Sequence, residues 1–144
     1  MPGKFVSWVR ECITSPRFSV AVNSTLVGYF EGKRGFRQGD LLSPYLFVLS
    51  VEVLSSLLAD CKNEGFGYHD RCSKVGLTYL CFADDLLIFS EASVHSVSAI
   101  QKVLSEFEFL SGLKANPDKS TCFCAVLSHL AQSQILSTLK MGEG

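Results

Sequence analysis

The sequence lacks a strong charge excess, a targeting signal and an uninterrupted membrane span. Lys and Arg total 13 against 14 Asp and Glu, so global charge gives no argument for a nucleic-acid partner. The first residues are not followed by the apolar run that a secretory signal requires. The most apolar segment, residues 41–58, is interrupted by serines, a proline and a glutamate. We therefore expect a buried helix there and no membrane interaction.

Repeats and low-complexity tracts are also absent, and 47% of the residues are hydrophobic. Both facts favour a folded globular domain over a disordered chain. Without a secretory context, the six cysteines are expected to be reduced, with no disulfides, in an unspecified intracellular (nuclear or cytoplasmic) location. Cys122 and Cys124 form the one close pair, but their spacing is too tight for the usual zinc knuckle. No metal is assigned to the cysteines.

The periodicity predicts helices and strands in an order typical of an α+β domain. Asn23-Ser24 is a plausible hairpin turn, Ser93 is a candidate helix cap, and Gly112 stands where a left-handed helix end is expected. Helices are predicted over residues 5–13, 42–62, 93–111 and 130–141, strands over 17–22, 25–30, 75–82, 86–90 and 121–127, and loops over 31–39 and 64–73. This order predicts antiparallel β-hairpins packed against helices.

Two adjacent aspartates, Asp84 and Asp85, stand between the apolar segments LCF and LLIF. Short polar segments between two apolar strands form hairpin tips, so both carboxylates are expected at one tip. Adjacent ionised acids repel one another unless cations neutralise them, and Mg²⁺ prefers such hard oxygen ligands. Alternatively, the pair merely supplies polar turn residues. The pattern alone leaves both interpretations open.

The first 40 residues are locally basic. They contain an excess of three positive charges, from Lys4, Arg10, Arg17, Lys33, Arg34 and Arg37 against Glu11, Glu31 and Asp40. A basic surface of this kind can contact phosphates, but it is more often an ordinary solvated surface. By itself it does not identify a partner.

Three motifs in order resemble the reverse transcriptases of non-LTR (LINE-type) retrotransposons, especially those of plants. They are residues 34–47 (RGFRQGDLLSPYLF), 82–85 (FADD) and 111–120 (SGLKANPDKS). Residues 8–30 also resemble the helix and hairpin that precede the first motif in this family. The resemblance therefore covers most of the chain and implies part of a polymerase palm.

The resemblance implies a role for each motif. Asp84 matches the acid that binds both catalytic Mg²⁺ ions, Asp85 matches its weaker neighbour, and Phe82 matches the ring near the primer end. Lys119 matches a lysine with a suggested part in charge neutralisation and proton donation to pyrophosphate. The nucleotide and template would contact Arg37, Gln38 and Gly39. The implied partners of the intact parent protein are an RNA template, a DNA primer and a dNTP.

The chain departs from the family pattern at two points. Leu41 stands where the family usually has proline. A further catalytic aspartate belongs to a strand whose position falls before Met1, so residues 1–144 are expected to be a partial palm domain without that strand, the fingers or the thumb. We therefore expect no measurable polymerase activity from the isolated chain.

Two other functions compete with a polymerase fragment that is completed by further sequence. One is an inactive transposon remnant with at most weak nucleic-acid binding. The other is an RNA-templated RNA polymerase, which shares the acidic hairpin but fits the loop of Arg37, Gln38 and Gly39 poorly. The codons upstream of Met1 discriminate between fragment and remnant. An open frame encoding an Asp-bearing strand favours the former, and a stop codon or frameshift favours the latter.

Overall fold

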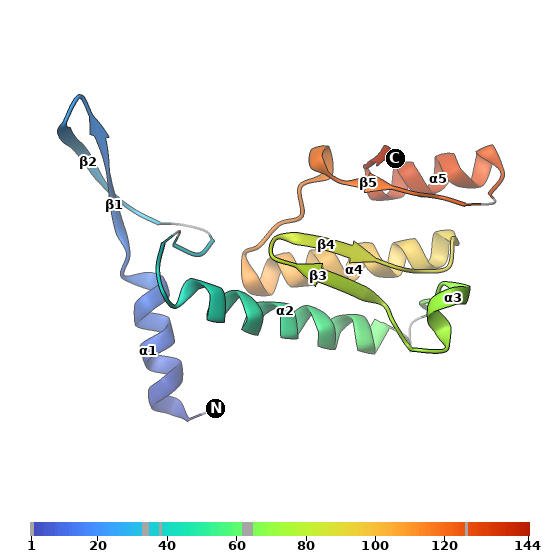
Figure 1. The fold of residues 1–144 in the computed structure, drawn as a ribbon, viewed down its shortest axis with the longest axis horizontal. Coiled ribbons are helices and arrows are strands. Elements are labelled where there is room, and N and C mark those ends of the chain that lie inside the picture. Colours follow the sequence, from blue (N-terminus) through green and yellow to red (C-terminus); the bar gives the residue numbers. More distant parts are fainter. Residues whose placement is uncertain (1, 33–34, 38, 62–64, 126) are drawn as a thin grey trace. The chain divides into compact units, whose positions relative to one another are not determined.

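The structure is a computed structural model that describes residues 2–32, 35–37, 39–61, 65–125 and 127–144. The chain divides into two compact units, residues 1–49 and 50–144 (Figure 1). Helices and short antiparallel hairpins alternate along the chain, which confirms the α+β prediction.

In the first unit, helix α1 (Gly3–Thr14) is followed by the hairpin of β1 (Arg17–Val22) and β2 (Thr25–Glu31). The strands pair antiparallel around a two-residue turn whose residues have φ values of 48° and 65°. Both values lie in the left-handed region, as a type I′ hairpin turn requires. The prediction of two strands around Asn23 and Ser24 is therefore confirmed.

This first hairpin is exposed on nearly all of its surface. Every residue of both strands is exposed except Phe18, which is half-buried. Its local contacts are the Phe18–Phe30 ring pair, with centroids 6.0 Å apart, and the Arg17–Glu31 ion pair at 3.2 Å. A two-stranded hairpin with so little packing is marginally stable in water.

Helix α2 (Ser43–Asp60) begins in the first unit and ends in the second. The prediction that it is a buried helix is wrong for most of its length, since only Leu54 and Leu58 are buried while Tyr45 is 71% exposed. The helix is apolar around most of its circumference, whereas the described core contacts it only near its C-terminal end. By length and composition alone, α2 is apolar enough to cross a membrane, a test that a soluble protein's core helix also passes.

The second unit has a hydrophobic core. It joins the end of α2, the side chains of Cys61 and Phe66, and the face of α4 (Val94–Ser111), with the hairpin of β3 (Tyr79–Phe82) and β4 (Asp85–Ile88) packed against it. The buried members are Leu54, Leu58, Cys61, Phe66, Ala99, Ile100 and Val103. Burial of these side chains is the main stabilisation of the unit.

Both ends of α4 form as the sequence predicts. The Ser93 hydroxyl accepts a hydrogen bond from the Ser96 backbone N–H at 3.1 Å. At the other end, Gly112 has φ 72° and its N–H donates to the Glu108 carbonyl. Ser96 is fully buried, and its hydroxyl accepts a hydrogen bond from the Gly67 N–H. The start of α4 therefore also anchors the preceding loop.

The C-terminal part differs more from the prediction. Helix α5 (His129–Leu139) packs on α4 and buries Ile135. Strand β5 (Thr121–Cys122) is much shorter than residues 121–127, and it pairs in parallel with β6 (Gly142–Glu143). A single turn of helix, α3 (Asp70–Ser73), forms within the predicted loop. Two-residue strands and one-turn helices are too short to produce a periodic pattern.

Candidate active site

The hairpin of β3 and β4 presents the two aspartates at its tip. Phe82 is the last residue of β3, Asp85 is the first residue of β4, and these two residues pair across the hairpin. Ala83 and Asp84 form the turn between them, and all four residues are exposed. The structure therefore places both carboxylates where a solvent-borne cation or phosphate can reach them.

The turn itself has an unusual backbone. Ala83 adopts φ 51°, a left-handed conformation that costs an L-residue roughly 1–2 kcal/mol. The Cys81 thiol donates to the Ala83 carbonyl at 3.6 Å, a weak contact that links the strand to its turn. The sequence did not single out either residue as part of the site. The available signal was the two-residue length of the turn, which requires positive φ at its first position.

The core holds this hairpin by one face. Tyr79, Leu86 and Ile88 pack against the core, while Leu80 and Leu87, paired on the other face, are 50% and 58% exposed. Successive strand residues point to opposite faces, so one face fixes the hairpin and the other leaves an apolar surface open.

The donor set of the tip suits a divalent ion but is incomplete. Two carboxylates supply hard oxygen ligands of the kind that Mg²⁺ prefers. Among the residues that the structure describes, no three His, Cys, Asp or Glu side chains gather as a metal-binding group. A stable ion at this tip therefore needs at least one further protein ligand or substrate phosphates.

The predicted nucleotide loop lies in the first unit and has a defined local structure. The Arg37 carbonyl accepts hydrogen bonds from the Ser43 hydroxyl at 2.6 Å and the Asp40 N–H at 3.3 Å. The Asp40 carboxylate in turn accepts from the Leu42 N–H at 2.9 Å, just before α2 begins at Ser43, one residue after its predicted start. These bonds fix the backbone at Arg37 and leave its guanidinium side chain exposed.

Gly39 has φ 83°, and a Cβ added there would meet no atom within 4 Å. Its local requirement is therefore conformational, because residues other than glycine rarely adopt this backbone. Gln38, together with Lys33 and Arg34, lies outside the described residues.

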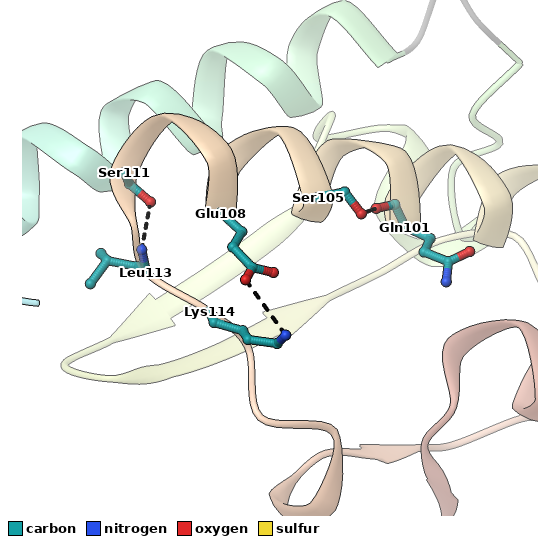
Figure 2. Close-up of polar contacts among 6 residues, drawn as sticks. All are labelled: Gln101, Ser105, Glu108, Ser111, Leu113 and Lys114. Atoms are coloured by element: carbon teal, nitrogen blue, oxygen red, sulfur yellow. Dashed lines mark hydrogen bonds and ion pairs between the residues drawn. The ribbon is translucent and has the colours of Figure 1, made fainter. Parts of the chain in front are cut away.

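The third motif forms a helix end followed by a tight turn. Figure 2 shows the helix end, where Lys114 forms an ion pair with Glu108 at 3.5 Å and the Ser111 hydroxyl accepts from the Leu113 N–H. Further along, the Asn116 side chain accepts from the Asp118 N–H at 3.0 Å and starts the 3₁₀ turn η2 (Pro117–Lys119).

Lys119 closes this turn through its backbone N–H, which donates to the Asn116 carbonyl, and its side chain is exposed. Within the described part of the chain, no ion pair joins Lys119 to Asp84 or Asp85. The structure thus gathers Phe82, Asp84 and Asp85 on one hairpin and places Lys119 on a separate turn of the same unit. Arg37 and Gly39 belong to the other unit.

Comparison with known proteins identifies the family of this architecture. The family model described as "Reverse transcriptase (RNA-dependent DNA polymerase)" matches residues 1–139. No solved structure matches the chain.

Three curated relatives are similar in sequence. An uncharacterized mitochondrial protein of Arabidopsis thaliana is 41% identical over 66 residues, covering 44% of this chain and 54% of its own length. A retrovirus-related Pol polyprotein from a type-2 retrotransposable element of Drosophila melanogaster is 34% identical over 85% of this chain. One from a type-1 element of Popillia japonica is 26% identical over 84%. The chain spans only 11% and 18% of these polyproteins, and about half of the plant protein.

Proposed function

Because the chain belongs to the reverse transcriptase (RNA-dependent DNA polymerase) family, we propose that its acidic hairpin is the catalytic tip of a polymerase that extends a DNA primer along an RNA template. Its relatives identify the chain as part of the reverse transcriptase domain of a non-LTR, plant-like retrotransposon. The observation that carries the proposal is the exposed pair Asp84 and Asp85 on a hairpin anchored to a core. The reaction belongs to the longer parent polypeptide.

We assign the metal-binding role to the two aspartates. The family uses divalent metal ions, and the proposed ions are Mg²⁺, with Asp84 as the main ligand and Asp85 as the weaker one. When bound, two such ions stabilise the charge on the attacking and leaving oxygens of nucleotidyl transfer. The core-packed face of β3 and β4 would keep the carboxylates in place, as a rigid element should.

The remaining residues are assigned to substrate contacts. Phe82, 83% exposed beside Asp85, would pack near the primer end. Arg37 would meet a phosphate, Gln38 would hydrogen-bond the incoming dNTP or the template, and Gly39 would present its backbone without a Cβ. The hydrogen bonds at the Arg37 carbonyl support a loop of fixed shape at this position.

Lys119 is proposed as the proton donor to the leaving pyrophosphate. The Lys119 ammonium group is exposed on a short, hydrogen-bonded turn, and no salt bridge between described residues involves it, so it can reach an anionic leaving group. General acids of this kind contribute about 10²–10⁴-fold to rate. Lys119→Ala should therefore lower the incorporation rate by that factor while primer binding stays unchanged.

Primer extension tests the proposal. The polypeptide extended upstream to include an Asp-bearing strand should incorporate dNTPs with Mg²⁺, an RNA template and a DNA primer. Asp84→Asn should reduce the rate by about 10²–10³-fold or more, the effect of losing one charge-stabilising group, and Asp85→Asn should cost less. Asp60→Asn, an exposed acid at the end of α2, is the matched control and should leave the rate unchanged.

The same assay distinguishes the proposal from an inactive remnant. The 144-residue chain alone should show no incorporation, since its described residues offer no metal-binding group beyond the two carboxylates of the tip. Clear incorporation by this chain would overturn the requirement for a further ligand. An extended polypeptide that is folded yet inactive, with salt-sensitive nucleic-acid binding as its sole activity, would favour the remnant.

A further inference from the structure

Two thiols outside the proposed active site lie in contact. Cys122, in β5, and Cys124, just after it, are both half-buried and have their Sγ atoms 3.7 Å apart, within hydrogen-bonding distance for sulfur. No disulfide joins any of the six cysteines, all of which lie in described segments.

We propose that Cys122 and Cys124 are a site of reversible dithiol oxidation, which closes to an intrachain disulfide when the chain meets a hydroperoxide. Neither the catalytic tip nor the motif residues take part, so this inference is independent of the proposed function. The chemistry needs no group beyond the two thiols and the peroxide.

The reaction has two balanced steps. The Cys124 thiolate attacks the peroxide, whose O–O bond breaks, giving a sulfenic acid and releasing water or an alcohol. The Cys122 sulfur then displaces hydroxide from that sulfenic acid as its own proton leaves, and the S–S bond forms with release of water. In total two thiols lose two electrons and two protons, and the peroxide is reduced.

The order of attack follows from the environment of Cys122. Burial, then its contact with Cys124, raises the pKa of the Cys122 thiol from 9.0 to about 11. Because the thiolate is the nucleophile, a thiol that keeps its proton reacts slowly with peroxide. Cys122 therefore suits the second step, in which the partner sulfur is already beside it.

Formation of the Cys122–Cys124 disulfide should disturb the pairing of β5 with β6. Two residues along an extended strand span about 6.4–6.8 Å, at the upper end of the Cα separations that disulfides accept and above the common 5.5–6 Å. Cys122 pairs with Glu143, and its carbonyl accepts the Gly144 N–H at 3.3 Å. Drawing the two sulfurs together bends the chain at Phe123, so the pairing of β5 with β6 should be lost.

Peptide mapping tests the proposal on the full chain. The tryptic peptide from Ser120 to Lys140 contains both cysteines and no others. After hydroperoxide treatment this peptide should not react with N-ethylmaleimide and should have a mass lower by two hydrogens. After reduction with dithiothreitol, N-ethylmaleimide should label both of its cysteines. The peptide from Val75 to Lys102, whose one cysteine is Cys81, is the internal control that cannot close on itself.

Other outcomes overturn the proposal. Full labelling of Cys122 and Cys124 under conditions that oxidise Cys81 would show that the contact has no redox consequence. Disulfides to other cysteines or between chains would show that these sulfurs reach other partners first. Single variants check the order: Cys122→Ser should trap a dimedone-reactive sulfenic acid on Cys124 faster than Cys124→Ser does on Cys122. Equal rates would contradict that order.

Discussion

At the scale of single residues, the backbone of the acidic turn determines where the two carboxylates point. Ala83 lies at φ 51° between Phe82 and Asp84, and a residue with a Cβ is strained there. Such strain beside functional side chains persists only where the surrounding structure enforces it. Here the pairing of Phe82 with Asp85 and the Cys81 contact enforce it.

Ala83→Gly should therefore stabilise the chain by about 1 kcal/mol, because glycine adopts the left-handed conformation without steric cost. The matched control is Ala92→Gly. This alanine is also exposed, but it has no positive φ, and the change should destabilise by up to about 1 kcal/mol. Urea unfolding midpoints measure both effects. A midpoint that falls equally in the two variants would mean that the turn is not strained.

Cys122 should make the stability of the fold depend on alkaline pH. Its folded-state pKa, about 11, is raised above the ordinary 9.0, so the fold favours the protonated thiol. That stabilisation is complete below the lower value and is lost as pH rises through the higher one. The unfolding free energy should therefore fall more steeply across this window in the wild type than in Cys122→Ala. Urea unfolding at several pH values checks this, and parallel curves would contradict it.

At the scale of elements, one face of the β3–β4 hairpin packs on the core and the other is exposed. Leu86 packs on the core, whereas its neighbour Leu87 is 58% exposed on the apolar outer face. An apolar outer face on a two-stranded sheet is expected where further chain normally covers it. This agrees with the proposal that the chain is one part of a longer polypeptide.

The same substitution at each of these two neighbours should show which face of the hairpin contributes to stability. Leu86→Thr should destabilise the chain by about 1–3 kcal/mol, because it removes apolar contact and buries a hydroxyl. Leu87→Thr, the same change one residue later, should stay within about 0.5 kcal/mol. Chemical denaturation with circular dichroism measures both. If Leu87→Thr proves the costlier change, the assignment of the faces is wrong.

The elements that the sequence predicted well are those with local chemical signals. The β1–β2 hairpin follows from a two-residue turn between β-rich runs, and α4 follows from its Ser93 cap and Gly112 end. The burial of α2 was predicted wrongly because apolar composition shows that a helix can be buried, not which part has neighbours. The β5–β6 pair depends on a contact between distant residues, and no local pattern encodes it.

At the scale of the whole molecule, the site was predictable only in part for a related reason. Asp84, Asp85 and Phe82 lie together because one hairpin contains them. The positions of Arg37 and Lys119 relative to that tip depend on tertiary contacts, and a metal site depends on ligands beyond two adjacent acids. The sequence motifs predicted these residues one segment at a time, and in our proposal a longer polypeptide brings them together.

The two units should also differ in stability, since the first has an exposed hairpin and the second has a core. Native-state hydrogen exchange of the full chain tests this. Amides of β1 and β2 should exchange with opening free energies near zero, and those of α4 should approach the global value.

The β3–β4 hairpin is the matched control for this comparison, because its strands have only 4 residues each against 6 and 7 in the first hairpin. If strand length determined protection, the longer hairpin would exchange more slowly. We expect the reverse, since Tyr79, Leu86 and Ile88 are packed on the core while the first hairpin is exposed on both faces. Slower exchange in β1 and β2 than in β3 and β4 would show that the first hairpin is stabilised independently of such packing.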